Sequence, residues 1–210
     1  MSQIKIDNIE KLLRSEPSEK LLIKAIKGLK SNKKNWKSRT ILTVICIILG
    51  IMIGTHANTV SIFQEAIDAI LNVSLAIFGI IFTGYALLQA FMNKQLLIQL
   101  ISNTKKGGAE EKSSLQDINE NFAYLMILYT LAVVITLILK IVMLCVPNEL
   151  AILEDLYINN AIASFAIILY FEFIGIILWR TIGFISTIYQ LFNAYAVTQI
   201  IEILDEEPDD

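Results

Sequence analysis

Four long apolar tracts constrain the fold of this chain more than any other feature. They cover residues 40–57, 66–92, 122–146 and 161–197. A helix needs about 20 apolar residues to cross roughly 30 Å of hydrocarbon, and the first tract lies at the lower limit of that range. The chain of 210 residues is 55% hydrophobic and 18% charged, with a mean hydropathy of +0.62, which is unusual for a soluble domain. We therefore predict an all-α integral membrane protein, a bundle of four transmembrane helices with cytoplasmic helical extensions.

The distribution of cations predicts the orientation of the bundle. Eleven of the 17 Lys and Arg residues lie in residues 1–39, and four more lie between the second and third tracts, whereas the loops 58–65 and 147–160 carry none. Short positive loops stay in the cytoplasm, so we expect both termini and the central loop inside, in the bacterial inner membrane. A five-span alternative splits the last tract near Arg180, but the sequence there lacks a turn signal.

The N-terminal segment, residues 1–39, carries eleven cations and four acidic residues, a net charge of +7. After Pro17, which suits a helix start, the apolar positions are Leu22, Ile26 and Leu29. They are flanked by Lys20, Lys24, Lys27 and Lys30. This pattern predicts an amphipathic helix on the anionic inner leaflet, with Trp36 as an interfacial anchor. The alternative is a positively charged topogenic segment that packs on nothing in particular. Because membrane topology already explains the positive charge of this segment, we expect no direct nucleic-acid binding.

The remaining chain divides into two hairpins. We expect a first transmembrane hairpin with an inner extension (residues 40–101), a cytoplasmic linker (102–114), a second hairpin with its extension (115–200) and an acidic tail (201–210). Residues 95–101 are still apolar and are expected to prolong the second helix. Ser114 and Asp117 have the spacing of a capping box, which predicts that the third helix begins before the membrane.

Two sets of small residues predict close helix packing. The second tract carries small or polar residues at alternating spacings of three and four, namely Ala69, Asn72, Ala76, Gly79, Thr83, Ala86 and Ala90. The first tract contains Gly50 and Gly54, a Gly-x-x-x-Gly motif. Because apolar burial drives little association within lipid, such smooth faces favour helix contacts. We predict a homo-oligomer in which one face packs inside the protomer and the other packs between subunits.

Ionisable residues inside the tracts carry most of the functional information, since a charge near the bilayer centre costs at least about 2.5 kcal/mol. Glu172 lies roughly 16 Å along the fourth tract, near the midplane. Lys140 in the third tract is a candidate partner, which predicts an intramembrane ion pair. The alternative has Lys140 snorkelling outward and Glu172 protonated. Arg180 is expected to mark the inner boundary of the fourth span and to reach lipid phosphates.

Catalytic and metal-binding patterns are weak. His56 is the single histidine, which excludes multi-histidine metal sites. Cys46 and Cys145 are expected near opposite leaflets, too far apart for a disulfide. The chain contains no glycine-rich phosphate loop and no Cys-x-x-Cys pair. We expect a non-enzymatic protein without a metal or cofactor.

Three function classes follow. They are a membrane sensor or effector that acts on a cytosolic partner, a small channel or ion-coupled transporter that uses Glu172, and a structural scaffold. In its layout of four spans with cytosolic helical ends, seen in residues 66–92 followed by 95–101, the chain resembles the small membrane subunits of prokaryotic phage-defence systems such as Kiwa. That resemblance implies a sensor of membrane perturbation that works with a cytosolic effector protein.

Overall fold

The computed structural model describes residues 17–29, 36–105, 112–147 and 155–206. Within these ranges the chain is almost entirely helical. The elements are α2 (Ser18–Gly28), α3 (Trp36–Gly54), α4 (Thr59–Phe91), α5 (Lys94–Ser102), β1 (Thr104–Lys105), β2 (Lys112–Ser113), α6 (Ser114–Cys145) and α7 (Leu156–Glu206). The two short strands pair antiparallel.

Four helices, α3, α4, α6 and α7, are long and apolar enough to cross a membrane. Each contains most of one predicted apolar tract and begins several residues before it. Helix α3 has 19 residues, about 28 Å at about 1.5 Å per residue, whereas α7 has 51 residues and is about 76 Å long. The shortest of the four therefore matches the hydrocarbon thickness, and α7 extends far beyond it.

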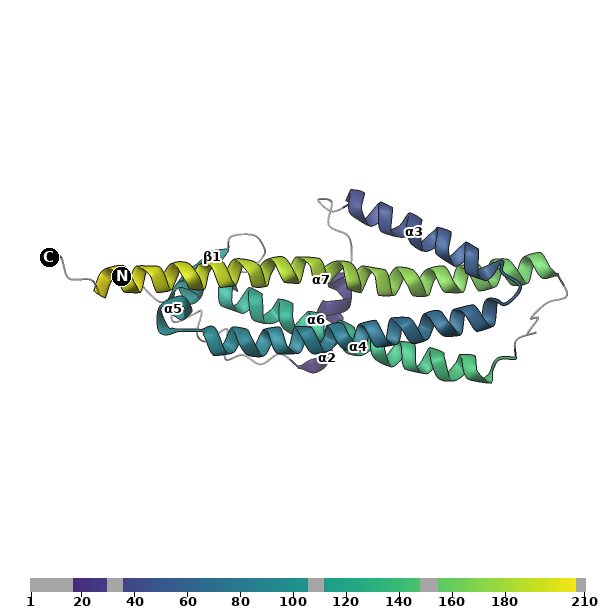
Figure 1. The fold of residues 1–210 in the computed structure, drawn as a ribbon, viewed down its shortest axis with the longest axis horizontal. Helices are drawn as coiled ribbons and strands as arrows, with labels where there is room; N and C mark the ends of the chain where they lie inside the picture. Colours follow the sequence, from purple (N-terminus) through teal and green to yellow (C-terminus); the bar gives the residue numbers. More distant parts are fainter. Residues whose placement is uncertain (1–16, 30–35, 106–111, 148–154, 207–210) are drawn as a thin grey trace.

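The four long helices alternate in direction, so the chain runs back and forth along one axis (Figure 1). Helix α3 packs mainly against the N-terminal half of α7, and α4 packs mainly against α6. The α3 to α4 connection and the start of α7 lie at one end of the bundle, while α5 and the C-terminal end of α7 lie at the other. Helix α2 lies against α6 near the middle.

The core is apolar with a few satisfied hydroxyl groups. Ile67, Phe122, Leu128 and Ile177 are almost fully buried between α4, α6 and α7. Two hydroxyl pairs join α6 to α7. Tyr129 Oη lies 2.6 Å from Thr181 Oγ1, and the Thr136 and Tyr170 hydroxyls are 2.9 Å apart. Buried hydroxyls need such partners, so these pairs fix how α6 and α7 face each other.

Much of the remaining apolar surface points outward. Helix α3 exposes large side chains along most of its length, including Ile41, Val44, Ile48 and Met52. Soluble monomers rarely expose continuous apolar patches of this kind, whereas surrounding hydrocarbon would cover them. The exposed surface and the four apolar helices are both compatible with a multi-pass membrane bundle.

The structure corrects the predicted boundaries at the central loop. Helix α4 ends at Phe91, and the separate helix α5 begins after Asn93, whose side chain accepts a 2.8 Å hydrogen bond from Leu96 N. The prediction that residues 95–101 prolong the second helix is therefore wrong. Helix α6 is capped by Ser113, one residue before the predicted Ser114, and its Oγ accepts a hydrogen bond from Gln116 N at 3.2 Å. As predicted, α6 begins ahead of its apolar tract.

The last apolar tract forms one unbroken helix, which is compatible with four spans. Helix α7 is continuous through Arg180, where the five-span alternative requires a break. The helix continues to Glu206, beyond the predicted start of the acidic tail at residue 201, and residues 207–210 lie outside the described ranges.

Candidate functional site

One face of α3 carries both polar residues and glycines toward α7. Its members are Arg39, Thr43, Cys46, Gly50 and Gly54, spaced three or four residues apart. A Cβ atom on Gly54 would lie 2.6 Å from the Ser164 backbone, and one on Gly50 would lie 3.1 Å from Ile168 N. Real Cβ atoms almost never approach so closely, so the Gly-x-x-x-Gly motif lets the two backbones touch inside the protomer.

Glu172 lies on the facing side of α7. Its Oε1 accepts a 3.0 Å hydrogen bond from Thr43 Oγ1 and lies 4.0 Å from Arg39 Nη2. Its other carboxylate oxygen is buried and has no hydrogen-bond partner. Glu172, predicted near the midplane of the fourth span, is thus held between α3 and α7 by a hydroxyl and a guanidinium from the N-terminal half of α3.

Lys140 has a different partner from the one predicted. Its Nζ lies 2.8 Å from Asp68 Oδ1 on α4, and both side chains are partly exposed. The predicted ion pair between Lys140 and Glu172 is therefore wrong, because α6 packs on α4 while Glu172 faces α3. Asp68 was not among the predicted site residues; it follows Ile67 on α4 and lies beside the small-residue stripe.

Arg39 joins three helices. One guanidinium nitrogen donates a 2.6 Å hydrogen bond to Leu29 O at the C-terminal end of α2, and the other terminal nitrogen faces Glu172 on α7. Cations are favoured at helix C-termini, where carbonyl groups lack partners. Arg39 was predicted only as part of the basic N-terminal segment. Its spacing to Thr43, Cys46 and Gly50 was the signal that it shares the buried face of α3.

A cavity of about 570 Å³ opens beside this contact. Its polar lining is made by Ser38, Arg39, Asn121, Trp179, Arg180 and Thr187, and its apolar wall includes Leu42, Leu125, Leu128, Ile176 and Phe184. Arg180, predicted as the inner-boundary anchor, lies against α2, since a Cβ on Gly28 would be 3.5 Å from its Nη1. The cavity therefore combines two guanidinium groups with a long apolar wall.

Trp36, the other predicted anchor, begins α3 and is 70% exposed. Because α3 and α7 run antiparallel, with Gly54 beside Ser164 and Thr43 bonded to Glu172, the start of α3 lies level with Trp179 and Arg180. Two tryptophans and two arginines thus share one level of the bundle. Tryptophan is enriched at membrane interfaces, so this level fits the boundary between hydrocarbon and headgroups.

Helix α2 packs on the bundle. Ala25 is almost fully buried against it, while Leu22, Ile23 and Ile26 remain exposed. The alternative of a segment that packs on nothing is wrong. Lys20, Lys24 and Lys27 lie on exposed positions of the helix, and Lys30 lies outside the described residues.

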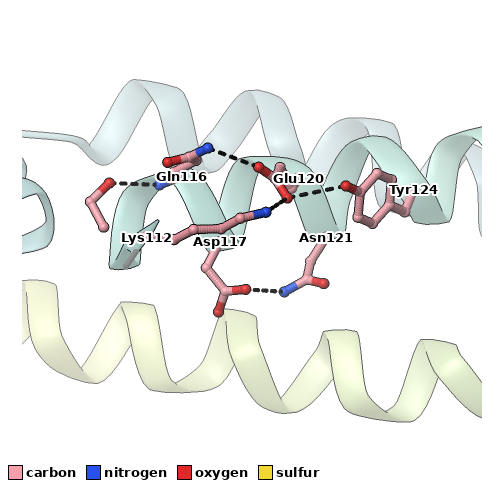
Figure 2. A network of polar contacts seen from close by, with 7 residues as sticks. Lys112, Gln116, Asp117, Glu120, Asn121 and Tyr124 are labelled. Atoms are coloured by element: carbon pink, nitrogen blue, oxygen red, sulfur yellow. Dashed lines mark hydrogen bonds and ion pairs between the residues drawn. The ribbon is translucent and has the colours of Figure 1, made fainter. Parts of the chain in front are cut away.

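A polar network fixes the start of α6, as Figure 2 shows. Glu120 Oε2 lies 2.6 Å from Lys112 Nζ and accepts a 3.1 Å hydrogen bond from Tyr124, and Gln116 donates to Oε1 at 3.0 Å. This carboxyl precedes the apolar tract of α6. Burial alone would raise the pKa of Glu120, but the hydrogen bonds and the charge of Lys112 outweigh it and lower that pKa. The network ties β2 to α6.

The small-residue stripe of α4 packs against no other helix among the residues that the structure describes. All seven of its residues, from Ala69 to Ala90, are exposed, and a Cβ on Gly79 would meet nothing within 4 Å. Asn72, the second residue of the stripe, has no hydrogen bond within the described chain. The side of α4 that packs on α6 and α7 is the bulky one, with Phe63, Ile67 and Ile81 buried. The stripe is a free surface of the protomer.

A second free surface, which the sequence analysis missed, follows α7 beyond Arg180. Its exposed apolar residues recur three or four positions apart, as Ile182, Ile185, Tyr189, Phe192, Ala196, Ile200 and Ile203; of these, Phe192 also packs on Phe91 of α4. Such spacing forms a seam on one side of a helix. The alternating spacing was visible in the sequence, but the burial of the opposite side, with Phe184 and Leu191, shows which side is left open.

The described residues contain no group of three metal-ligating side chains. His56 accepts a hydrogen bond from Asn58 N at 3.1 Å in the turn after α3. Cys46 and Cys145 are both free thiols, the first buried and the second exposed. None of these three residues lines the cavity.

Comparison of the chain with protein-family models, with curated proteins and with solved structures finds no match.

Proposed function

We propose that this chain is a non-enzymatic, homo-oligomeric subunit of a bacterial inner membrane that couples the state of the bilayer to a cytosolic partner. The observation that carries the proposal is α7, one unbroken helix of 51 residues. It contacts α3 in its N-terminal half and continues along α6, α4 and α5. A helix about 76 Å long is more than twice the thickness of the hydrocarbon.

The proposed orientation rests on charge. The cytosolic side is the one that holds α2, α5 and the central loop, where the sequence concentrates Lys and Arg. The inner leaflet is anionic and attracts basic segments, so α2, with Lys20, Lys24 and Lys27 exposed, would lie near that leaflet. Any change in the packing of α3 and α7 within the bilayer would then reach the cytosol through continuous backbone.

The proposed homo-oligomer rests on the two free surfaces. The Asn72 side chain is exposed. In the proposed bilayer, lipid would offer it no hydrogen bond, and a second copy of the stripe would supply one. Beyond Arg180, the exposed apolar seam of α7 would lie in water unless another helix covered it. Both surfaces are covered if protomers associate along α4 and α7.

The resemblance to phage-defence subunits gives this proposal a biological setting. A subunit that senses membrane perturbation and recruits a cytosolic effector needs cytosolic surface, and the end of the bundle formed by α5, β1, β2 and the last turns of α7 offers it. That setting rests on layout alone.

The experiment measures whether bilayer tension moves the cytosolic end. Full-length protein with Cys46 and Cys145 replaced by Ser and with Ile203→Cys is labelled with a spin label and reconstituted into vesicles. We expect the distance between labels on neighbouring protomers to change when osmotic tension is applied. Ser186→Pro should abolish the change, because Pro interrupts α7, while Ser186→Ala should retain it. If tension changes the distance neither in the labelled parent nor in Ser186→Ala, the proposed coupling is contradicted and a structural scaffold is favoured.

A second candidate function is an ion channel that uses Glu172. It is favoured by the buried carboxylate oxygen of Glu172 that lacks a partner. Planar-bilayer recording tests it. A conductance that disappears in Glu172→Gln, with oligomeric state unchanged, would support the channel, and silent membranes with correctly inserted protein would exclude it.

A further inference from the structure

We propose that the cavity between α3, α6 and α7 binds a phosphate group, supplied by an anionic phospholipid of the inner leaflet. Arg39 and Arg180 both line this cavity of about 570 Å³. The inference deepens the proposed function by naming a membrane ligand, and it rests on the proposed insertion in the bilayer.

The charges around the cavity do not balance. Glu172 lies 4.0 Å from Arg39, at the limit of an ion pair, and no described carboxylate forms an ion pair with Arg180. The end of α2 contributes about half an elementary negative charge near both guanidinium groups. Among the described residues that line the cavity itself, Arg39 and Arg180 carry the only full charges, and two like charges repel each other in a partly buried site. An anion between them would relieve that repulsion.

The donors suit phosphate. A guanidinium presents five N–H groups in a planar fork that matches phosphate oxygens. Arg39 uses one of its terminal nitrogens on Leu29 O. The Arg180 guanidinium has no hydrogen bond to the described residues. Ser38 and Asn121 add neutral polar groups to the same lining, whereas the Thr187 hydroxyl already donates to Gly183 O. Together they offer several donors within one cavity to an anion that accepts many hydrogen bonds.

The rest of the lining suits a lipid more than a soluble phosphate. Leu42, Leu125, Leu128 and Ile176 form an apolar wall on the side toward the membrane-spanning part of α3 and α6. Trp36 and Trp179 place the arginines at the level of the headgroups. A lipid phosphate at this level would have its acyl chains pointing along the apolar wall.

Native mass spectrometry of the full chain in mild detergent tests the proposal. We expect phosphatidylglycerol to bind more tightly than phosphatidylcholine or diacylglycerol. Arg180→Gln should weaken phosphatidylglycerol binding about tenfold, since it removes a charge-assisted contact, and Arg180→Lys should recover part of the loss. The matched control is Lys37→Gln, which removes an exposed cation at the start of α3 outside the lining. Equal binding by Arg180→Gln and the parent, or an equal loss in Lys37→Gln, would overturn the proposal.

A second measurement does not depend on an arginine variant. In Trp36→Phe the remaining tryptophan is Trp179, which lines the cavity. Phosphatidylglycerol brominated on its acyl chains should quench Trp179 fluorescence more strongly than brominated phosphatidylcholine at the same mole fraction, and equal quenching would overturn the proposal. Displacement of the lipid by inorganic phosphate would assign the same phosphate site to a soluble ligand. A chain that keeps its response to tension but shows no preference among lipids would refute this inference and leave the proposed function intact.

Discussion

Helices α3 and α4 each carry a face of small residues, and the two faces meet different surroundings. On α3, Gly50 and Gly54 touch the backbone of α7 so closely that no side chain fits. On α4, the stripe from Ala69 to Ala90 is exposed along its whole length, and the space around Gly79 is empty. Small residues therefore permit two helices to approach closely, but they do not determine which helix packs on the face. The α3 face packs inside the protomer, and the α4 face meets no other helix among the described residues.

The largest effect is expected from filling the α3 face. Gly54→Leu would place a side chain where a Cβ alone already lies 2.6 Å from the Ser164 backbone. Overpacking of this kind costs about 3 kcal/mol when the backbone cannot move. We expect a lower melting temperature and weaker protection of α3 from proteolysis, measured in detergent. An unchanged melting temperature would show that α3 does not depend on backbone contact with α7.

An intermediate effect is expected at the other edge of α4, where Asp68 pairs with Lys140. Each single change, Lys140→Met or Asp68→Leu, removes the pair and leaves one charge alone on an apolar surface. The double variant leaves neither charge, so a double-mutant cycle isolates the pair. We expect a coupling of about 1 kcal/mol, in the range of partly exposed pairs. A coupling near zero would mean that apolar packing alone holds α4 on α6.

The smallest effect on the protomer is expected from filling the α4 stripe. Gly79→Leu meets no atom within 4 Å, so its effect on protomer stability should stay within about 0.5 kcal/mol. Cross-linking in native membranes should nevertheless fall, because the added side chain would keep a second copy of the stripe at a distance. Leu87→Ala, a change at an exposed position of the same helix outside the stripe, is the control. If cross-linking persists in Gly79→Leu, the subunit contact is not made by the α4 stripe and would be assigned to the seam on α7.

Sequence patterns predicted the helices better than the contacts between them. Length and hydropathy identified all four apolar helices, because crossing hydrocarbon requires a long apolar segment whatever its neighbours. The pairing of helices was harder. The ion-pair partners of Lys140 and Glu172 depend on which helix packs beside each residue. The sequence does not reveal that α3 packs on α7 while α4 packs on α6.

The candidate site was predicted in part. Glu172 and Arg180 stood out because charges are rare in apolar tracts. Arg39 did not, because it closes a run of eleven cations and looks like one more topogenic charge. Its role depends on the end of α2 returning to meet α3 and α7, a tertiary contact that composition cannot report.

The length of α7 also determines how far its last turn moves when the helix tilts. From Arg180 to Glu206 the helix extends about 39 Å at about 1.5 Å per residue. If it tilts as a stiff rod about the level of Arg180, a rotation of about 5° displaces its last turn by about 3 Å, whereas atoms near the pivot move by a small fraction of that. A lipid that binds or leaves near Arg180 and rotates α7 slightly would thus displace the C-terminal end of the helix much more than the atoms around Arg180.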